Sequence, residues 1–448
     1  MRRPLLIIAT ASIALAAPAS SQPSAPTSSQ PGARTAAAER VDSAAVVREV
    51  RRIIAERYVL PERRPALDAV LAEGLSSGRY NVGDPTALAA AINADLERVG
   101  RDRHLNFSYN PQQARILGAA QNQGAPDPSG YQRQVRGQNH GVRELRVLPG
   151  NVRYMAYDGF AWIGEESAAA LNTAMQFLKG GDAVIIDLRR NGGGSPQAVQ
   201  HLVSHFMAAD RSLVTFHMNG QPTPDRLSTL AELPAGRMVG KPLYVLTSNA
   251  TASAAEEFSG HVAGYRLGEL VGENTAGAGF RNDLVPVGNG FILSVSVGRA
   301  VLASTGRDWE AVGIPPTIQT PVPGALEVAH GHALRRLAAA AQGPERARLE
   351  AVAEGVLARA TPGTPALALA AYAGSFGERR VIHENGRLFY QRGERPRLAL
   401  LPLGGNRFAV EEDPLLRVEF QADGSRALSF DLGPAGGPPQ GRYERTGG

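Results

Sequence analysis

Hydrophobic positions along this chain change their spacing several times, and each change marks a different kind of element. Apolar residues recur three and four positions apart between residues 41 and about 105, a spacing that predicts helices. Asp84 followed by Pro85 is a typical helix start, because aspartate caps free amides and proline fits the first turn. Alternation from His104 onward predicts a strand. We therefore expect an N-terminal helical domain at 41–111.

The middle of the chain alternates short apolar runs with helical patterns. Buried strands are predicted at 182–188 and 242–247, because each run is short, continuous and rich in β-forming residues. Such alternation is typical of an α/β domain, which we expect at 142–322. The preceding segment 112–141 is rich in Gln, Gly and Pro, and this composition predicts a flexible loop.

The last third of the chain has two further patterns. Two Ala- and Arg-rich helices are expected in a connector at 323–362. From 363 to 448, short alternating runs are separated by Gly and Asn turns. This pattern predicts a small, separate antiparallel β domain.

The N-terminus has the features of an export signal. Two arginines precede an apolar stretch that is too short to span a bilayer, and small residues with an A-x-A site follow. This predicts a signal peptide at 1–19 with cleavage after Ala19. Residues 20–40 are rich in Ser, Pro, Ala and Gln and are expected to form a disordered linker. We thus expect a secreted or periplasmic protein without stable membrane insertion after signal cleavage.

Composition narrows the possible chemistry. The chain has no cysteine, which excludes disulfides, thiol catalysis and thiolate metal sites. The formal charge of +5 is small for 448 residues and the arginines are scattered, so no nucleic acid partner is expected. There is no His-Glu-x-x-His motif and no other recognisable metal-ligand cluster in the sequence. We therefore predict neither a metal nor another cofactor.

Ser253 is the candidate nucleophile, because it lies where the strand at 242–247 is predicted to give way to a helix. A side chain there faces the free amides and positive end of the helix, which favour developing negative charge. An ordinary structural explanation exists as well. Ser253 and Glu256 fit a capping box, which would contribute about 1 kcal/mol of helix stability. This segment alone leaves catalysis and capping open.

A serine hydrolase also needs a base and oxyanion donors. The two lysines, Lys179 and Lys241, both precede strands and belong to no evident site loop, so a histidine is the expected base. Of the nine histidines, His104 is the best placed, at a polar turn before a strand, although such histidines are commonly structural. Gly192 and Gly193 follow a buried strand and can bring backbone amides close to a substrate, a composition that ordinary turns share.

Five motifs occur in order along the chain: LPGNVRY at 148–154, AVIIDLRRNGGG at 183–194, TSNATASAAEEF at 247–258, GENTAG at 272–277 and WEAVG at 309–313. Together they resemble the tail-specific protease superfamily, serine peptidase family S41, in the branch similar to the interphotoreceptor retinoid-binding protein modules. The resemblance extends from the N-terminal helices to about Pro321. It implies an α/β protease core with a mixed sheet flanked by helices, ClpP/crotonase-like, next to the helical bundle and the small antiparallel β domain.

The resemblance also implies roles for individual residues. Ser253 matches the family nucleophile, and the Ala254 amide, with a glycine amide of the run containing Gly192 and Gly193, matches the oxyanion hole. The processing proteases of the family use a lysine as base, but Ala278 stands in its place here.

Tricorn-like members of the superfamily use an upstream histidine and a later glutamate instead of the lysine. Asp102-Arg-His104 and Trp309-Glu310 resemble these two segments. The resemblance therefore implies a triad of Ser253, His104 and Glu310, in which His104 deprotonates the serine and Glu310 orients the relay.

The function expected from these observations is that of an exported serine endopeptidase. It would hydrolyse bonds in peptides or unfolded protein through an acyl-enzyme on Ser253. Two alternatives remain open: a non-catalytic module of the same fold that binds apolar ligands, and a peptidase or esterase for small substrates. A serine, a histidine and a glutamate at matching positions favour the enzyme.

Overall fold

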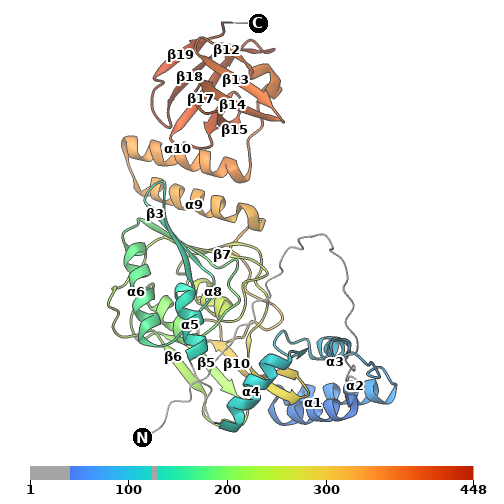
Figure 1. The fold of residues 1–448 in the computed structure, drawn as a ribbon. Coiled ribbons are helices and arrows are strands. Elements are labelled where there is room, and N and C mark those ends of the chain that lie inside the picture. Colours follow the sequence, from blue (N-terminus) through green and yellow to red (C-terminus); the bar gives the residue numbers. More distant parts are fainter. Residues whose placement is uncertain (1–40, 124–128, 447–448) are drawn as a thin grey trace, which may run out of the picture.

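The computed structural model describes residues 41–123 and 129–446. The expected signal peptide at 1–19 and linker at 20–40 lie outside the described residues. Figure 1 shows a small helical domain, a central α/β core, a pair of helices and a β domain at the C-terminal end of the chain. Within the described part, no helix is long and apolar enough to cross a membrane.

The N-terminal domain is a bundle of three helices, α1 (Ser43–Arg57), α2 (Arg64–Ser76) and α3 (Pro85–Gly100). Asp84 caps α3 as predicted, since its carboxylate accepts the Ala87 N–H at 2.7 Å. The strand β1 (Asn106–Tyr109) follows and pairs with β10 (Phe291–Leu302) of the core. Phe107 stacks on Phe291 with ring centroids 5.2 Å apart. The bundle and the core therefore share one apolar cluster, which fixes the turn before β1.

The strand β1 belongs to a five-stranded antiparallel sheet of the core. Its strands β1, β10, β5 (Ser212–Met218) and β6 (Asp225–Ser228) follow in this order, and β9 (Phe280–Gly288) also pairs with β10. The β9–β10 hairpin turns at Asn289 and Gly290, both with positive φ. The hydrophobic pattern made no prediction for this segment.

The main sheet has six strands in the order β11-β8-β7-β4-β3-β2. These are β2 (Val142–Leu148), β3 (Val152–Tyr157), β4 (Ala183–Asp187), β7 (Leu243–Thr247), β8 (Glu269–Gly272) and β11 (Ile318–Gln319). All neighbours are parallel except β2 and β3, so the sheet is mixed as predicted. Every residue of β4 and β7 is buried, which explains their continuous apolar runs.

Helices cover both faces of the main sheet. One face contributes to a cluster with α6 (Glu165–Lys179), α7 (Pro196–Ser204) and α8 (Ala254–Gly264). The other face packs against α9 (Ala325–Ala340) and α10 (Gly343–Ala360). Figure 1 shows α9 and α10 lying between the core and the C-terminal β domain.

The C-terminal domain is an antiparallel sheet of eight strands joined in sequence order. They are β12 (Gly374–Phe376), β13 (Arg379–Glu384), β14 (Arg387–Arg392), β15 (Leu398–Gly404), β16 (Arg407–Val410), β17 (Leu416–Ala422), β18 (Ala427–Pro434) and β19 (Gly441–Glu444). The sheet curls until the Thr446 N–H donates to the Ser375 carbonyl at 2.9 Å. The β domain is thus a nearly closed barrel with its own apolar cluster.

The segment 112–141 corrects one expectation. Instead of a loop, it contains the helices α4 (Pro111–Gln123) and α5 (Ser129–Gly137) and a short 3₁₀ turn. Arg136 forms an ion pair with Glu166 on α6 at 2.7 Å, and His140 Nδ1 lies 2.9 Å from Ser167 Oγ. These contacts hold α5 and the 3₁₀ turn against α6, and α4 packs against β9, so tertiary packing overrides a composition that favours loops.

Candidate active site

The site lies at the edge of the main sheet where β4 and β7 end. Because these strands are parallel neighbours, the segments that follow them leave the sheet at the same edge. Ala252 N–H donates to the Asn191 carbonyl at 3.0 Å, and Thr251 Oγ1 donates to the Leu188 carbonyl at 2.8 Å. The glycine run after β4 is therefore tied to the segment that carries Ser253.

Ser253 occupies a strained turn directly before α8. Its backbone has φ 55° and ψ −120°, a combination that residues with a side chain rarely adopt. Gly193 has φ 107° and packs so closely that a Cβ there would lie 2.7 Å from Ser253 Cβ and 2.9 Å from the Ala252 carbonyl oxygen. Glycine is required at position 193, and the close approach holds the serine turn in place. Such strain is concentrated at functional sites.

The predicted oxyanion donors differ in their availability. The Gly193 N–H already donates to Asn191 Oδ1 at 2.9 Å. Within residues 41–123 and 129–446, the Gly192 and Ala254 amides donate to no acceptor. Ala254 is the first residue of α8, where the helix dipole favours negative charge. Gly192 and Ala254 are thus the amides that this structure leaves free for an oxyanion.

Glu256 has a larger role than the sequence indicated. Its carboxylate accepts the Ser253 N–H at 2.9 Å, as one half of the predicted capping box. It also accepts the amides of Gly277 and Ala278, at 2.7 and 2.8 Å, and the Thr275 hydroxyl at 2.6 Å. The side chain is fully buried, and burial raises its pKa. Glu256 therefore joins the Ser253 turn to the loop that precedes β9.

Glu310 holds the second part of the site together. Its Oε2 accepts the amides of Gly279 at 2.6 Å and Phe280 at 3.1 Å, and its Oε1 accepts the Arg103 N–H at 3.1 Å. These bonds fix the turn that carries His104. Glu310, His104 and Asp102 each offer one polar atom to a group in which all such atoms lie within 4.8 Å of one another. The structure thus brings the predicted His104 and Glu310 together and adds Asp102.

Burial and charge act in opposite directions on the ionisable groups here. Burial lowers the pKa of His104, and the Asp102 carboxylate opposes this effect. Burial, and then the charge of Asp102, raises the pKa of Glu310 to about 7. The charge of Asp102 therefore offsets only part of the cost that burial adds to an imidazolium on His104.

One short loop connects the two parts of the site. The amides of Gly277 and Ala278 bind Glu256, and the amide of the next residue, Gly279, binds Glu310. The loop therefore runs from the Ser253 turn to the His104 group. Ala278 provides no amine at the position of the family lysine.

Neither lysine of the chain points to an alternative base. Lys179 Nζ donates to the Ala235 carbonyl at 3.2 Å, and Lys241 Nζ donates to the Lys179 carbonyl at 3.1 Å. Both therefore bind backbone carbonyls away from the Ser253 turn, since Lys241 precedes β7 and Ser253 follows it.

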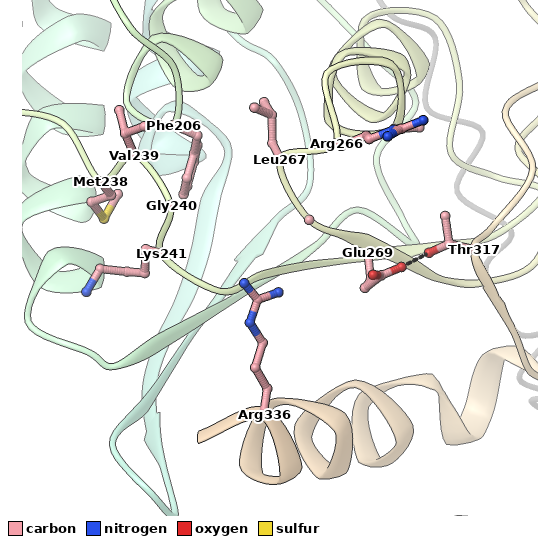
Figure 2. Close-up of a pocket in the computed structure, with 12 residues that line it drawn as sticks. Phe206, Met238, Val239, Gly240, Lys241, Arg266, Leu267, Glu269, Thr317 and Arg336 are labelled. Atoms are coloured by element: carbon pink, nitrogen blue, oxygen red, sulfur yellow. Dashed lines mark hydrogen bonds between the residues drawn. The ribbon is translucent and has the colours of Figure 1, made fainter. Parts of the chain in front are cut away.

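A separate pocket of about 450 Å³ lies at the opposite edge of the main sheet, where β7 and β8 begin (Figure 2). Lys241 and Glu269 line it, and Figure 2 shows Arg336 extending into it from α9. Glu269 accepts a hydrogen bond from the Thr317 hydroxyl. None of the predicted site residues lines this pocket, so the candidate chemistry lies at the other end of the strands.

Comparisons with known proteins identify the family to which two segments of the chain are similar. Residues 151–320 match the model of peptidase family S41, and residues 33–137 match the N-terminal domain of peptidase S41 in eukaryotic IRBP, the interphotoreceptor retinoid-binding protein. The first match contains the Ser253 turn and Glu310, and the second contains His104.

Two curated relatives are carboxyl-terminal processing proteases. CtpB of Bacillus subtilis is 28% identical over 177 residues, which are 39% of this chain and 35% of the relative. The enzyme of Synechocystis sp. is 30% identical over 150 residues, 34% of this chain and 33% of the relative. The chain thus spans about a third of the length of these relatives.

The solved structure of the photosystem II D1 C-terminal processing protease is 18% identical to this chain, with a TM-score of 0.40, over 63% of this chain and 94% of that one. With both family models matched in chain order around the site, the chain belongs to peptidase family S41.

Proposed function

We propose that this chain is a serine peptidase that hydrolyses peptide bonds through an acyl-enzyme on Ser253. The observation that carries the proposal is the strained Ser253 turn at the start of α8, next to the free amides of Gly192 and Ala254. The two curated relatives are named as processing proteases, which supports protein or peptide substrates for this chain.

In the proposed reaction, His104 takes the proton from Ser253 Oγ as the oxygen attacks the carbonyl carbon of the scissile bond. The carbonyl oxygen becomes an oxyanion that accepts hydrogen bonds from the Ala254 and Gly192 amides. The imidazolium on His104, stabilised by Glu310 and Asp102, protonates the departing amine when the C–N bond breaks. Water then attacks the acyl group with His104 as base, and the second product leaves as a carboxylic acid.

We also propose a class of substrate and a cellular location. The substrate is a peptide or an unfolded protein, because an extended chain can reach a serine at the edge of a sheet. The signal peptide expected at 1–19 supports export to the periplasm or the medium. The mixed sheet flanked by helices supports a ClpP/crotonase-like arrangement of the core.

A fluorophosphonate probe tests the activated serine directly. We expect the wild type to be labelled once, Ser253→Ala not at all, and His104→Gln at least about 100-fold more slowly, because general-base catalysis typically contributes 10²–10⁴-fold. His383→Gln, an exposed histidine on β13, is the matched control and should label like the wild type. Casein degradation should follow the same order.

Two results would contradict the proposal. Equal labelling of Ser253→Ala and wild type would remove Ser253 as nucleophile. Absence of labelling and of casein degradation with folded wild type would favour a non-catalytic module that binds apolar ligands.

A further inference from the structure

The group formed by Asp102, His104 and Glu310 has a property that proton transfer does not require. One polar atom of each side chain lies within 4.8 Å of the others, although the residues come from a turn before β1 and a loop after β10. Asp102 is only 6% exposed. In the described part of the chain, neither carboxylate forms an ion pair with an arginine or lysine.

Two buried atoms of this group form no regular hydrogen bond with the described residues, although the buried Tyr58 hydroxyl interacts with the Asp102 carboxylate. They are Asp102 Oδ2 and His104 Nδ1. Burying such atoms without a partner costs on the order of 1–3 kcal/mol each, and a bound ion is one of the common explanations. Both atoms belong to side chains that contribute to the group, so a ligand there would satisfy them together.

Backbone amides hold both carboxylates in position. Asp102 Oδ1 accepts the amides of His104 at 2.8 Å and Leu105 at 3.2 Å, which leaves Oδ2 free. Glu310 is held by three amides, from Arg103, Gly279 and Phe280. Hydrogen bonds to the ligating carboxylates are the outer-shell support that metal sites use.

The donor set identifies the kind of ion. One imidazole nitrogen and two carboxylate oxygens are ligands of zinc, whereas calcium and magnesium prefer oxygen ligands alone. Zinc bonds of about 2.0–2.2 Å require ligand atoms to lie roughly 3.4 Å apart. The present separations of up to 4.8 Å would have to close by up to about 1.4 Å when an ion binds.

We propose that Asp102, His104 and Glu310 bind one divalent transition-metal ion of the zinc class, with water in the fourth position. The inhibitory consequence rests on the proposed function, but binding itself does not. A His104 nitrogen that binds the metal cannot accept the proton of Ser253. A His104 ring held by the metal also cannot move toward the serine. The ion therefore inhibits the peptidase reversibly.

Calorimetry tests binding without any assumption about activity. Metal-free protein without an affinity tag is titrated with ZnCl₂, as wild type and as Ser253→Ala. We expect one ion per chain in both. His104→Gln and Asp102→Asn should weaken binding at least tenfold, and His383→Gln should bind like the wild type. Visible absorption of the Co²⁺ form provides a second readout, because tetrahedral coordination gives a strong signal that His104→Gln should abolish.

The outcomes separate this inference from the proposed function. Wild type that is folded but binds no zinc, or His104→Gln that binds as tightly as wild type, overturns the metal site. If the fluorophosphonate probe labels wild type equally with and without saturating zinc, the inhibitory role is wrong. If the probe labels nothing even without metal, the proposed function fails, while zinc binding by Ser253→Ala still decides the metal site.

Discussion

At the scale of single residues, the serine turn depends on side chains that do no chemistry. Gly193 is needed because a Cβ would collide with Ser253, and Glu256 is needed because four donors converge on its carboxylate. The sequence showed Glu256 as a helix cap, and the fold makes it the link to the loop before β9. Nothing in the sequence of a helix-capping residue and a later Gly-rich loop indicates that the two will be in contact in the fold.

Glu256→Gln should therefore destabilise the protein and slow labelling of Ser253. Each carboxylate oxygen accepts two donors, so the amide NH₂ of glutamine faces two N–H or O–H groups in either orientation. We expect a loss of about 2–4 kcal/mol in the free energy of unfolding, since buried donors lose a charged acceptor. Denaturant unfolding measures it. Glu232→Gln, at an exposed glutamate, is the control, and equal stability of the two variants would contradict the role of Glu256.

At the scale of elements, the pattern of apolar residues predicted most helices and strands but not all of them. The β9–β10 hairpin was missed, although its Asn289-Gly290 turn with two positive φ angles is a strong hairpin signal. The helices α4 and α5 were missed because their composition favours loops. Contacts to α6 stabilise α5, and α4 packs against β9. Local sequence therefore predicts a helix or strand reliably only where that element does not depend on contacts with distant segments.

The stability of the protein should depend on pH, because a buried histidine lies where α9 packs against the main sheet. His330 on α9 is 5% exposed, and its Nε2–H donates to the Pro149 carbonyl at 2.9 Å, beside the turn between β2 and β3. Burial lowers its pKa to about 4, and His205 on the other face of the sheet has a pKa lowered by burial to about 4 as well. Both histidines are therefore neutral in the folded protein at pH values where the unfolded chain takes up protons.

The free energy of unfolding should fall as the pH drops below about 6.5 and should stop falling from this cause near pH 4. Each histidine can contribute up to about 3 kcal/mol over this range. Urea unfolding between pH 7 and pH 4 measures the effect. In His330→Gln, whose amide can still donate to Pro149, the decline should be less steep than in the wild type. A slope identical to that of the wild type would show that His330 does not titrate in this way.

At the scale of the whole molecule, the β domain has its own core. The apolar residues of the β domain form one cluster inside the barrel. The apolar residues of α9 and α10 belong to a different cluster, on the face of the main sheet that these helices cover. The contacts between α10 and the barrel include polar pairs, among them Arg407 with Glu354 and Arg417 with the Ala351 carbonyl. The barrel therefore has little part in holding the candidate site.

A protein truncated after residue 362 should stay folded and keep the serine reactive. The core loses polar contacts, and the apolar side of α10 remains packed against the sheet and α9. We expect a circular dichroism melting temperature close to that of the main transition of the full chain, and unchanged labelling by fluorophosphonate. A truncated protein that aggregates or melts far below the full chain would show that the barrel supports the core.

The sequence by itself determined the strand-to-helix junction at Ser253, the glycine run after β4, the helical connector and the antiparallel β domain. These features depend on hydrophobic period and on turn residues, which are local. The position of His104 at a polar turn made it the candidate base, and the family resemblance supplied Glu310 and the roles of both residues. Only the tertiary structure decided that Asp102 joins them, that the Gly193 amide is occupied, and that Glu256 links the two parts of the site. Each of these facts depends on contacts between segments distant in the chain, which periodicity cannot reveal.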